Sequence, residues 1–186
     1  MSISDNKGKS LKAEIKTKWS SDLARYPSKP WLKEPSILAV YWYRHGQSVD
    51  LMNPGVIKTI RVKFYWFIFH ILEVLLGISI AKTVKSGGGL RIHHFGNIFI
   101  HKNVILGKNC TLRQGVTIGN RYNDDAVPIL DDNIEIGAYA QILGAIKVGD
   151  NAKIGAMSLV LNDVPKNSTA CGIPAKVVKA SYKNEE

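Results

Sequence analysis

The chain has 186 residues, of which 45% are hydrophobic, and this is enough for one substantial core. Its two cysteines, Cys110 and Cys171, exclude a disulfide framework and a four-cysteine zinc site. The N-terminus does not show the charged and then apolar pattern of a signal peptide, so the sequence predicts a cytoplasmic protein.

The formal net charge is +10, and the surplus is concentrated in residues 1–63, which contain 12 Lys and Arg against 5 Asp and Glu. Such a surplus suits a membrane surface, a polyanionic partner or the phosphates of a cofactor, although a solvated basic face is the commonest explanation. The sequence contains no nucleic-acid-binding motif, and nucleic acid is therefore not expected as a partner.

Residues 1–79 are expected to form a helical region. Its first segment is polar, and we expect it to be frayed at its tip and broken by Pro27, Pro30 and Pro35. A first helix is predicted to run from Pro35 to a glycine stop at Gly46. A second is predicted with Asn53 as its cap, Pro54 in its first turn and Gly77 as its terminator.

A strongly apolar run covers residues 62–80 of this region. A transmembrane span is disfavoured because His70 and Glu73 near the middle would be costly in hydrocarbon, and because the run is close to the minimum of about 17–20 residues. Burial against other helices or a sheet is the expected arrangement. The alternative is peripheral contact with the inner face of the membrane, helped by Lys58, Arg61 and Lys63.

From about residue 80 the sequence repeats with a period of six. Each unit begins with a long aliphatic residue, has a small or branched residue four positions later, and carries Gly, Asn or Asp between them. This pattern is typical of a chain that makes a short strand and a tight corner every six residues, so that three strands form one triangular coil. A period of six fits neither a helix nor a two-residue alternation. The long aliphatic positions are Leu106, Leu112, Ile118, Leu130, Ile136, Ile142, Val148, Ile154 and Val160.

Three segments resemble those of known proteins: "GLRIHHFGNIFIHKNVILGKNCTLRQGVTIGN", "NIEIGAYAQILGAIKVGDNAKIGAMSLVLNDVP" and "CGIPAKVVK". They resemble the hexapeptide-repeat acyltransferases of the serine acetyltransferase branch, and most of all the acetyltransferases of colanic-acid and capsule gene clusters. The resemblance implies a mainly β fold, with a left-handed parallel β-helix over residues 80–170. A helical region over 1–79 would precede it and a tail over 171–186 would follow. It also implies a homotrimer with active sites between adjacent β-helices.

Three histidines lie close together in the first of these segments. In the serine acetyltransferase branch the catalytic base is a histidine before an x-x-G turn, and this implies His94 as the base. An imidazole suits that role because its pKa lies near neutral pH. Counting hexads alone places His94 in an inward slot, so a core role is the alternative. His93 is expected to contact the acceptor or to lie on the surface, and His101 to be a corner residue. A zinc site of the three is disfavoured by their spacing.

Two positions depart from the serine-specific pattern. Ser79 stands where the family has an aspartate that orients the base. The projecting loop over residues 121–129 has Ala126 and Val127 before Pro128, where the serine-specific enzymes have Arg and His. Loss of such a carboxylate clamp would cost a serine substrate on the order of 2–3 kcal/mol.

These departures favour an O-acetyltransferase that moves acetyl from acetyl-CoA to a sugar hydroxyl in surface polysaccharide biosynthesis. Two alternatives stay open, which are serine O-acetyltransferase of cysteine biosynthesis and a non-catalytic trimeric scaffold.

For the donor, the resemblance implies acetyl-CoA without a metal, with its pantetheine arm along small corner residues and its phosphates near Lys176. Corners need small residues in any case, and Lys176 could be solvated. The corner residues that match are Gly119, Asn120, Ala138, Gly144 and Ala156.

Overall fold

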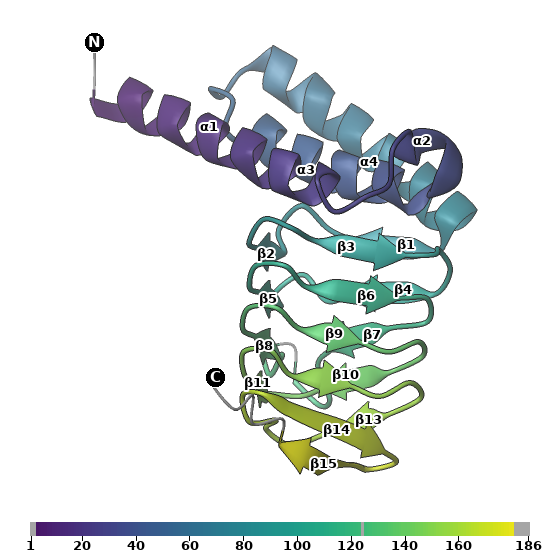
Figure 1. Cartoon of the computed structure of the whole chain (residues 1–186). Coiled ribbons are helices and arrows are strands. Elements are labelled where there is room, and N and C mark those ends of the chain that lie inside the picture. Colours follow the sequence, from purple (N-terminus) through teal and green to yellow (C-terminus); the bar gives the residue numbers. More distant parts are fainter. Residues whose placement is uncertain (1–2, 124, 181–186) are drawn as a thin grey trace, which may run out of the picture.

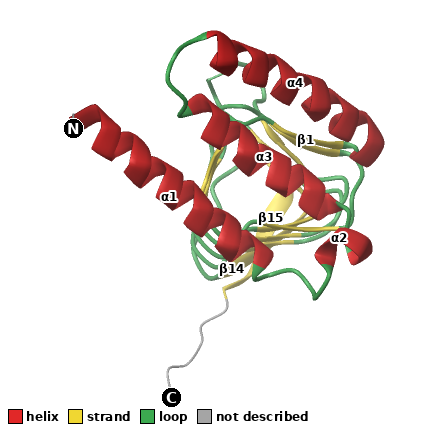
Figure 2. Cartoon of the chain, turned by 90° about the horizontal axis from the view of Figure 1, so that it is seen from above, coloured by secondary structure: helices red, strands yellow, loops and turns green. Residues whose placement is uncertain are grey.

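The computed structural model describes residues 3–123 and 125–180, and there four helices lie across one end of a parallel β-helix (Figure 1). Seen along the axis, α3 lies across the end of the β-helix with α1 and α4 on either side of it (Figure 2). The predicted mainly β fold with N-terminal helices is confirmed, and it is consistent with a left-handed β-helix. The helices are α1 (Ile3–Leu23), α2 (Pro30–Lys33), α3 (Ser36–Asp50) and α4 (Val56–Leu76).

The β-helix has three faces, each a sheet of parallel strands except for the final antiparallel pair β14 and β15. The first face contains β1 (Ile78–Ile80), β4 (Ile98–Ile100), β7 (Thr117–Gly119), β10 (Gln141–Leu143) and β13 (Leu159–Val160). The second contains β2 (Lys85–Ser86), β5 (Ile105–Leu106), β8 (Ile129–Leu130) and β11 (Lys147–Val148). The third contains β3 (Arg91–His93), β6 (Thr111–Arg113), β9 (Glu135–Ile136), β12 (Lys153–Ile154), β14 (Ser168–Gly172) and β15 (Ala175–Ala180). Of the expected tail, residues 171–172 end β14 and residues 175–180 form β15, while 181–186 lie outside the described residues.

We number the corners by the faces they join. Corner 1 leads from the third face to the first, corner 2 from the first to the second, and corner 3 from the second to the third. At corner 3 successive coils place an asparagine in the left-handed region, with φ between 54° and 59° for Asn133, Asn151 and Asn167. The side-chain Nδ2 of Asn151 donates to Asn167 Oδ1 at 2.9 Å. Asparagine tolerates this backbone conformation and also bonds its neighbour along the axis, which explains its place in the hexad.

The interior of the β-helix follows the predicted pattern. The nine long aliphatic residues of the repeat are buried, and so are the small or branched residues four positions after eight of them. The exception is Ile118, which Tyr122 of the projecting loop follows at that spacing. The same apolar core extends beyond the coils and includes Val40 and Tyr43 of α3. The helices therefore close the open end of the β-helix.

Most of the polar first segment forms the 21-residue helix α1, which ends at Leu23, before Pro27. Residues 1–2, at the tip that was expected to be frayed, lie outside the described residues. Contacts made just after the helix hold it to the β-helix. Arg25 Nη2 donates to Thr111 Oγ1 at 2.8 Å, and the Tyr26 hydroxyl accepts from the Ile92 amide at 3.0 Å. Tertiary contacts of this kind stabilise a helix whose own sequence is too polar to indicate burial.

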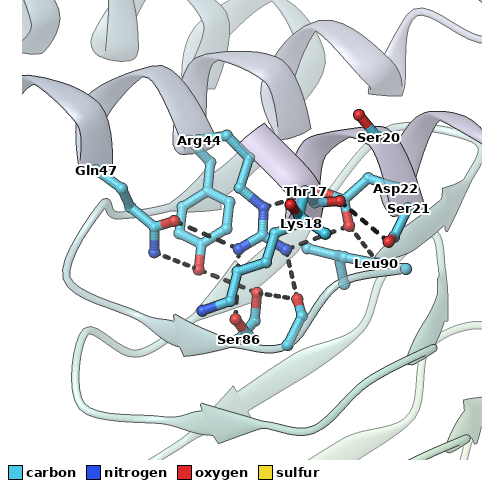
Figure 3. Close-up of polar contacts among 12 residues, drawn as sticks. Thr17, Lys18, Ser20, Ser21, Asp22, Arg44, Gln47, Ser86 and Leu90 are labelled. Carbon is cyan, nitrogen blue, oxygen red and sulfur yellow. Dashed lines mark hydrogen bonds and ion pairs between the residues drawn. The ribbon is translucent and has the colours of Figure 1, made fainter. Parts of the chain in front are cut away.

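A buried ion pair joins α1 to α3 (Figure 3). Asp22 accepts from Arg44 Nε at 2.8 Å and Nη2 at 3.2 Å, and also from the Leu90 amide at 2.7 Å. Both side chains are almost completely buried. Arg44 also donates to the carbonyl oxygen of Gly87, so the pair connects two helices with the turn between β2 and β3.

Helix α3 does not stop at Gly46, and the predicted terminator was wrong. A Cβ built on Gly46 would lie 2.3 Å from a ring carbon of Tyr65 and 2.9 Å from Cβ of Lys82. The glycine therefore permits close packing of α3 against α4. Helix α4 ends at Gly77, whose φ is 60°, as predicted, whereas it begins at Val56, so Asn53 and Pro54 precede the helix.

Changing Gly46 to alanine is expected to lower the free energy of unfolding by about 1–3 kcal/mol, because the new methyl group overpacks against Tyr65. The matched control is Gly8→Ala in α1, where a Cβ meets no atom within 4 Å and the better helix propensity of alanine should stabilise the fold slightly. Urea unfolding measures both, and changes of the same sign would contradict this packing role.

No helix within residues 3–180 is both long and apolar enough to cross a membrane. The expectation that the apolar helix is buried holds for one side of it only. Tyr65, Phe69 and Leu76 of α4 are buried, while many apolar side chains on its other side are exposed.

Candidate active site

The corner that carries His94 is longer than the corners below it. Five residues separate His93 from Phe99, whereas three separate their strand partners Arg113 and Thr117 in the next coil. The first coil thus contains two extra residues at corner 1. Because the strands on both sides keep their pairing, the extra residues must bulge outward from the β-helix.

His94 lies in this bulge with φ of 65° and an exposed side chain. The core role that hexad counting allowed is therefore wrong, since the longer corner takes this residue out of the inward slot. Phe95 and Phe99 are each 50% exposed and give the corner an apolar surface. The imidazole rings of His93 and His94 lie 6.5 Å apart.

His93 is half-buried at the end of β3, and its strand partner on β6 is Arg113. Burial, and then the charge of Arg91, lowers the pKa of His93, so its imidazole is neutral at pH 7. Arg91 is itself paired with Glu34 at 2.8 Å. Arg113 is exposed beside His93, and its positive charge also lowers the pKa of that histidine. The sequence interpretation missed Arg113, because the two extra residues at corner 1 take its pairing with His93 out of the hexad register.

Ser79 lies on β1, where it pairs with Phe99 of β4. Ser79 is therefore in the first face, next to β4, which is the strand that follows the His94 bulge.

The predicted cofactor residues fall into two groups. Ala138 and Ala156 lie at corner 1, in the coils below His94, where the Met157 amide donates to the Ala138 carbonyl oxygen at 2.8 Å. The other group lies at corner 2, at the ends of strands of the first face. There the Gly144 amide donates to the Gly119 carbonyl oxygen at 3.0 Å. This second group consists of Gly119, Asn120 and Gly144. Within one protomer, therefore, the two groups lie on opposite edges of the first face.

Corner 1 also carries an outward apolar strip below His94. Tyr139 and Met157 are 53% and 67% exposed. A Cβ on Gly115 would lie 2.2 Å from the Tyr139 ring, so the aromatic side chain lies directly over that glycine. The strip thus includes an aromatic ring that packs directly on the backbone of the neighbouring coil.

Corner 2 contains His101 and the loop that interrupts the repeats. His101 is a corner residue, as predicted, because its carbonyl oxygen accepts from the Val104 amide at 3.0 Å. One coil later, the pairing of Thr117 with Gln141 spans 24 residues instead of the 18 from Phe99 to Thr117, so the loop adds six residues. Within residues 3–123 and 125–180, no three His, Cys, Asp or Glu side chains form a group that could hold a metal ion.

Lys176 is exposed on β15, at the end of the β-helix farthest from the helices (Figure 1). In the third face, β3 and β15 are five strand positions apart. At about 4.8 Å for each position, the His94 corner and Lys176 are roughly 24 Å apart along the axis.

Comparison with known proteins decides the family. No family model matches the chain. A serine acetyltransferase from Helicobacter pylori is 36% identical over 149 residues, covering 73% of this chain and 87% of that protein. The chain belongs to the serine acetyltransferase family.

Two further members show how far the likeness extends. The serine acetyltransferase of Synechococcus elongatus is 38% identical over 114 residues, which cover 60% of this chain and 47% of that protein. The chain therefore spans about half the length of this relative. The solved structure of the serine acetyltransferase from Neisseria gonorrhoeae has a TM-score of 0.77 at 30% identity, covering 91% of this chain and 67% of that one.

Membership of the serine acetyltransferase family confirms the resemblance at that level, and the predicted sugar acceptor was wrong. The relatives are named for serine, and they do not support the closer likeness to colanic-acid and capsule acetyltransferases. The error came from the loop before Pro128. The absence of two basic residues from this loop removes one way to bind the serine carboxylate. It does not remove other cationic side chains from the site.

Proposed function

We propose that this protein is an acetyl-CoA-dependent serine O-acetyltransferase. The observation that carries the proposal is the match with the Helicobacter pylori serine acetyltransferase, which extends over 87% of that protein. The likeness to the Neisseria gonorrhoeae structure, with a TM-score of 0.77, supports it.

His94 is the proposed catalytic base. It takes the proton of the serine hydroxyl while that oxygen attacks the carbonyl carbon of the acetyl thioester. The new C–O bond forms, the C–S bond breaks, and the proton passes from the imidazolium to the CoA thiolate. The products are O-acetylserine and CoA, and no covalent enzyme intermediate is required. The exposed position of His94 in its bulge leaves the ring accessible to both substrates.

Acetyl-CoA is proposed to lie lengthwise along the β-helix, with its acetyl group at His94 and its phosphates near Lys176. The separation of roughly 24 Å between these two ends suits an elongated donor. The small residues of corner 1, Ala138 and Ala156, would let the pantetheine arm approach the backbone.

A homotrimer is proposed because the predicted cofactor residues occupy two corners of one protomer. Gly119, Asn120 and Gly144 at corner 2 lie across the first face from His94. They can line the same cleft as a catalytic corner only if corner 2 of one protomer meets corner 1 of the next. Sedimentation equilibrium of the full chain measures the assembly, and a monomer would contradict this arrangement.

Arg113 is proposed to bind the carboxylate of serine in place of the missing clamp. It is exposed, it pairs in register with His93, and His93 is adjacent to His94. A guanidinium binds a carboxylate through two parallel hydrogen bonds, and the neutral imidazole of His93 can add a third contact.

Changing Arg113 to leucine is expected to raise KM for L-serine about 10- to 100-fold with a smaller change in kcat, because a charge-assisted contact is lost. The same variant should lose the preference for L-serine over L-serinamide, which lacks the carboxylate. The matched control is Arg121→Leu in the corner 2 loop, whose guanidinium lies over the Tyr122 ring at 4.9 Å. An unchanged KM in Arg113→Leu, or an increase in Arg121→Leu alone, would assign the carboxylate to another group.

The direct test of the function is CoA release from acetyl-CoA with millimolar L-serine, together with identification of the acetylated product by mass spectrometry. We expect saturable release that depends on both substrates. If the folded protein neither releases CoA nor acetylates L-serine, the proposal fails and the non-catalytic scaffold takes its place.

A further inference from the structure

Helix α4 presents a stripe of exposed apolar side chains on the side that faces away from the rest of the protein. Val74, Ile57 and Phe67 are 83%, 67% and 62% exposed, respectively. The members follow one another at alternating spacings of three and four residues, which places them on one face of the helix. The apolar stripe consists of Ile57, Ile60, Phe64, Phe67, Ile71 and Val74.

The opposite side of α4 is the side that packs against the rest of the protein. Tyr65, Phe69 and Leu76 are buried there, and the Tyr65 carbonyl oxygen accepts from the Trp42 indole of α3 at 3.0 Å. The apolar stripe is therefore an additional surface that the described fold does not cover. A continuous exposed apolar surface of this kind marks a place of interaction.

The charges beside the apolar stripe are basic. Arg61 and Lys63 are exposed on its two flanks. The only acidic residue of α4 is Glu73, which is half-buried and contacts His70 Nδ1 at 3.2 Å. Around the helix, Lys63 and His70 lie between Glu73 and the apolar stripe. Where α4 begins, Lys12 and Lys58 line a hollow of about 600 Å³, which also includes Val56 and Ile57 of the helix.

We infer that the apolar stripe of α4 docks on the surface of an anionic phospholipid bilayer. Its aromatic and aliphatic side chains enter the boundary of the acyl chains, while Arg61 and Lys63 meet headgroup phosphates and the hollow at Lys12 and Lys58 accepts a further one. A second copy of the chain fits less well, because two stripes packed together would bring the basic flanks near one another with no exposed acidic side chain of α4 to pair with them.

This docking would give the molecule a fixed orientation. The helices lie at one end of the β-helix, so a membrane at α4 would contact that end and leave the far end, with β14 and β15, in solution (Figure 1). The inference does not rest on serine as the acceptor, because the stripe and the His94 corner are separate surfaces.

The test is co-sedimentation of the full chain with vesicles of phosphatidylcholine alone or with 30% phosphatidylglycerol. The wild-type protein is expected to bind the anionic vesicles at least about tenfold more tightly, and 0.5 M salt should weaken this binding. Phe67→Ser with Val74→Ser should remove most of it, and Lys63→Glu should weaken binding to anionic vesicles only. The matched control is Leu32→Ser on α2, which removes an apolar side chain that is 82% exposed elsewhere and should bind like wild type.

Circular dichroism and CoA release with soluble L-serine show that each variant stays folded, and they separate failure of docking from failure of the proposed function. Absence of binding by the wild type, or equal binding by the Phe67 and Val74 double variant, overturns the inference. A smaller assembly for that double variant in sedimentation equilibrium, without a change in vesicle binding, would assign the apolar stripe to a second copy of the chain instead.

Discussion

Replacing His94 with alanine is expected to lower kcat for acetyl transfer from acetyl-CoA to L-serine by about 10²- to 10⁴-fold, the usual contribution of a general base. The affinity for acetyl-CoA should change little, because the imidazole acts on the acceptor hydroxyl. Stopped-flow measurement of CoA release, with isothermal titration of CoA binding, checks both expectations.

His70→Ala provides the matched control for this experiment. His70 is exposed on α4, where its Nδ1 lies 3.2 Å from Glu73, and its replacement should leave kcat within about threefold. If His94→Ala folds normally and transfers acetyl at the wild-type rate, the base is another group. If both variants lose the same activity, the effect does not identify His94 as the base.

Replacing Asp22 with alanine is expected to destabilise the fold by about 3–5 kcal/mol, because it leaves the guanidinium of Arg44 buried without its counter-charge. The Leu90 amide would also lose the carboxylate oxygen that it contacts at 2.7 Å. Urea unfolding, followed by circular dichroism, measures the loss.

An exposed ion pair of the same helix serves as the control for that experiment. Glu14 and Lys18 of α1 are 2.8 Å apart on the surface, and Glu14→Ala should cost less than about 1 kcal/mol. Similar losses in the two variants would show that burial does not set the energy of the Asp22 contact.

The sequence was sufficient to predict the β-helix because each coil repeats the same physical requirement. A long aliphatic residue must enter the interior every six residues, and the corners must accept an unusual backbone conformation. Leu112 and Ile136 obey the first rule and Asn133 the second, so many independent positions indicate one fold. The buried pattern in the structure confirms this reading.

The helical region was harder to predict because its decisive contacts are between segments far apart in the sequence. Gly46 has the sequence signal of a helix stop, yet the residue that explains it is Tyr65, on another helix. The polar helix α1 is likewise held by Asp22 and Arg25 through partners in the β-helix. No local pattern contains that information.

The candidate site was predicted in part. The x-x-G motif selected His94, but strict counting of hexads assigned it an inward slot, because counting assumes corners of constant length. Arg113 was missed because the longer corner shifts its pairing with His93 out of the six-residue register. Only the pairing of β3 with β6 places its guanidinium beside His93.

The two irregular coils have a consequence for how this architecture changes its chemistry during evolution. Additions of two residues near His94 and of six between β7 and β8 leave the pairing of the strands on either side intact. Lengthening or shortening the chain at these two places can thus alter what the protein binds without repacking its interior. Such proteins can acquire new acceptors through small insertions and deletions, while most substitutions within the rungs affect stability alone.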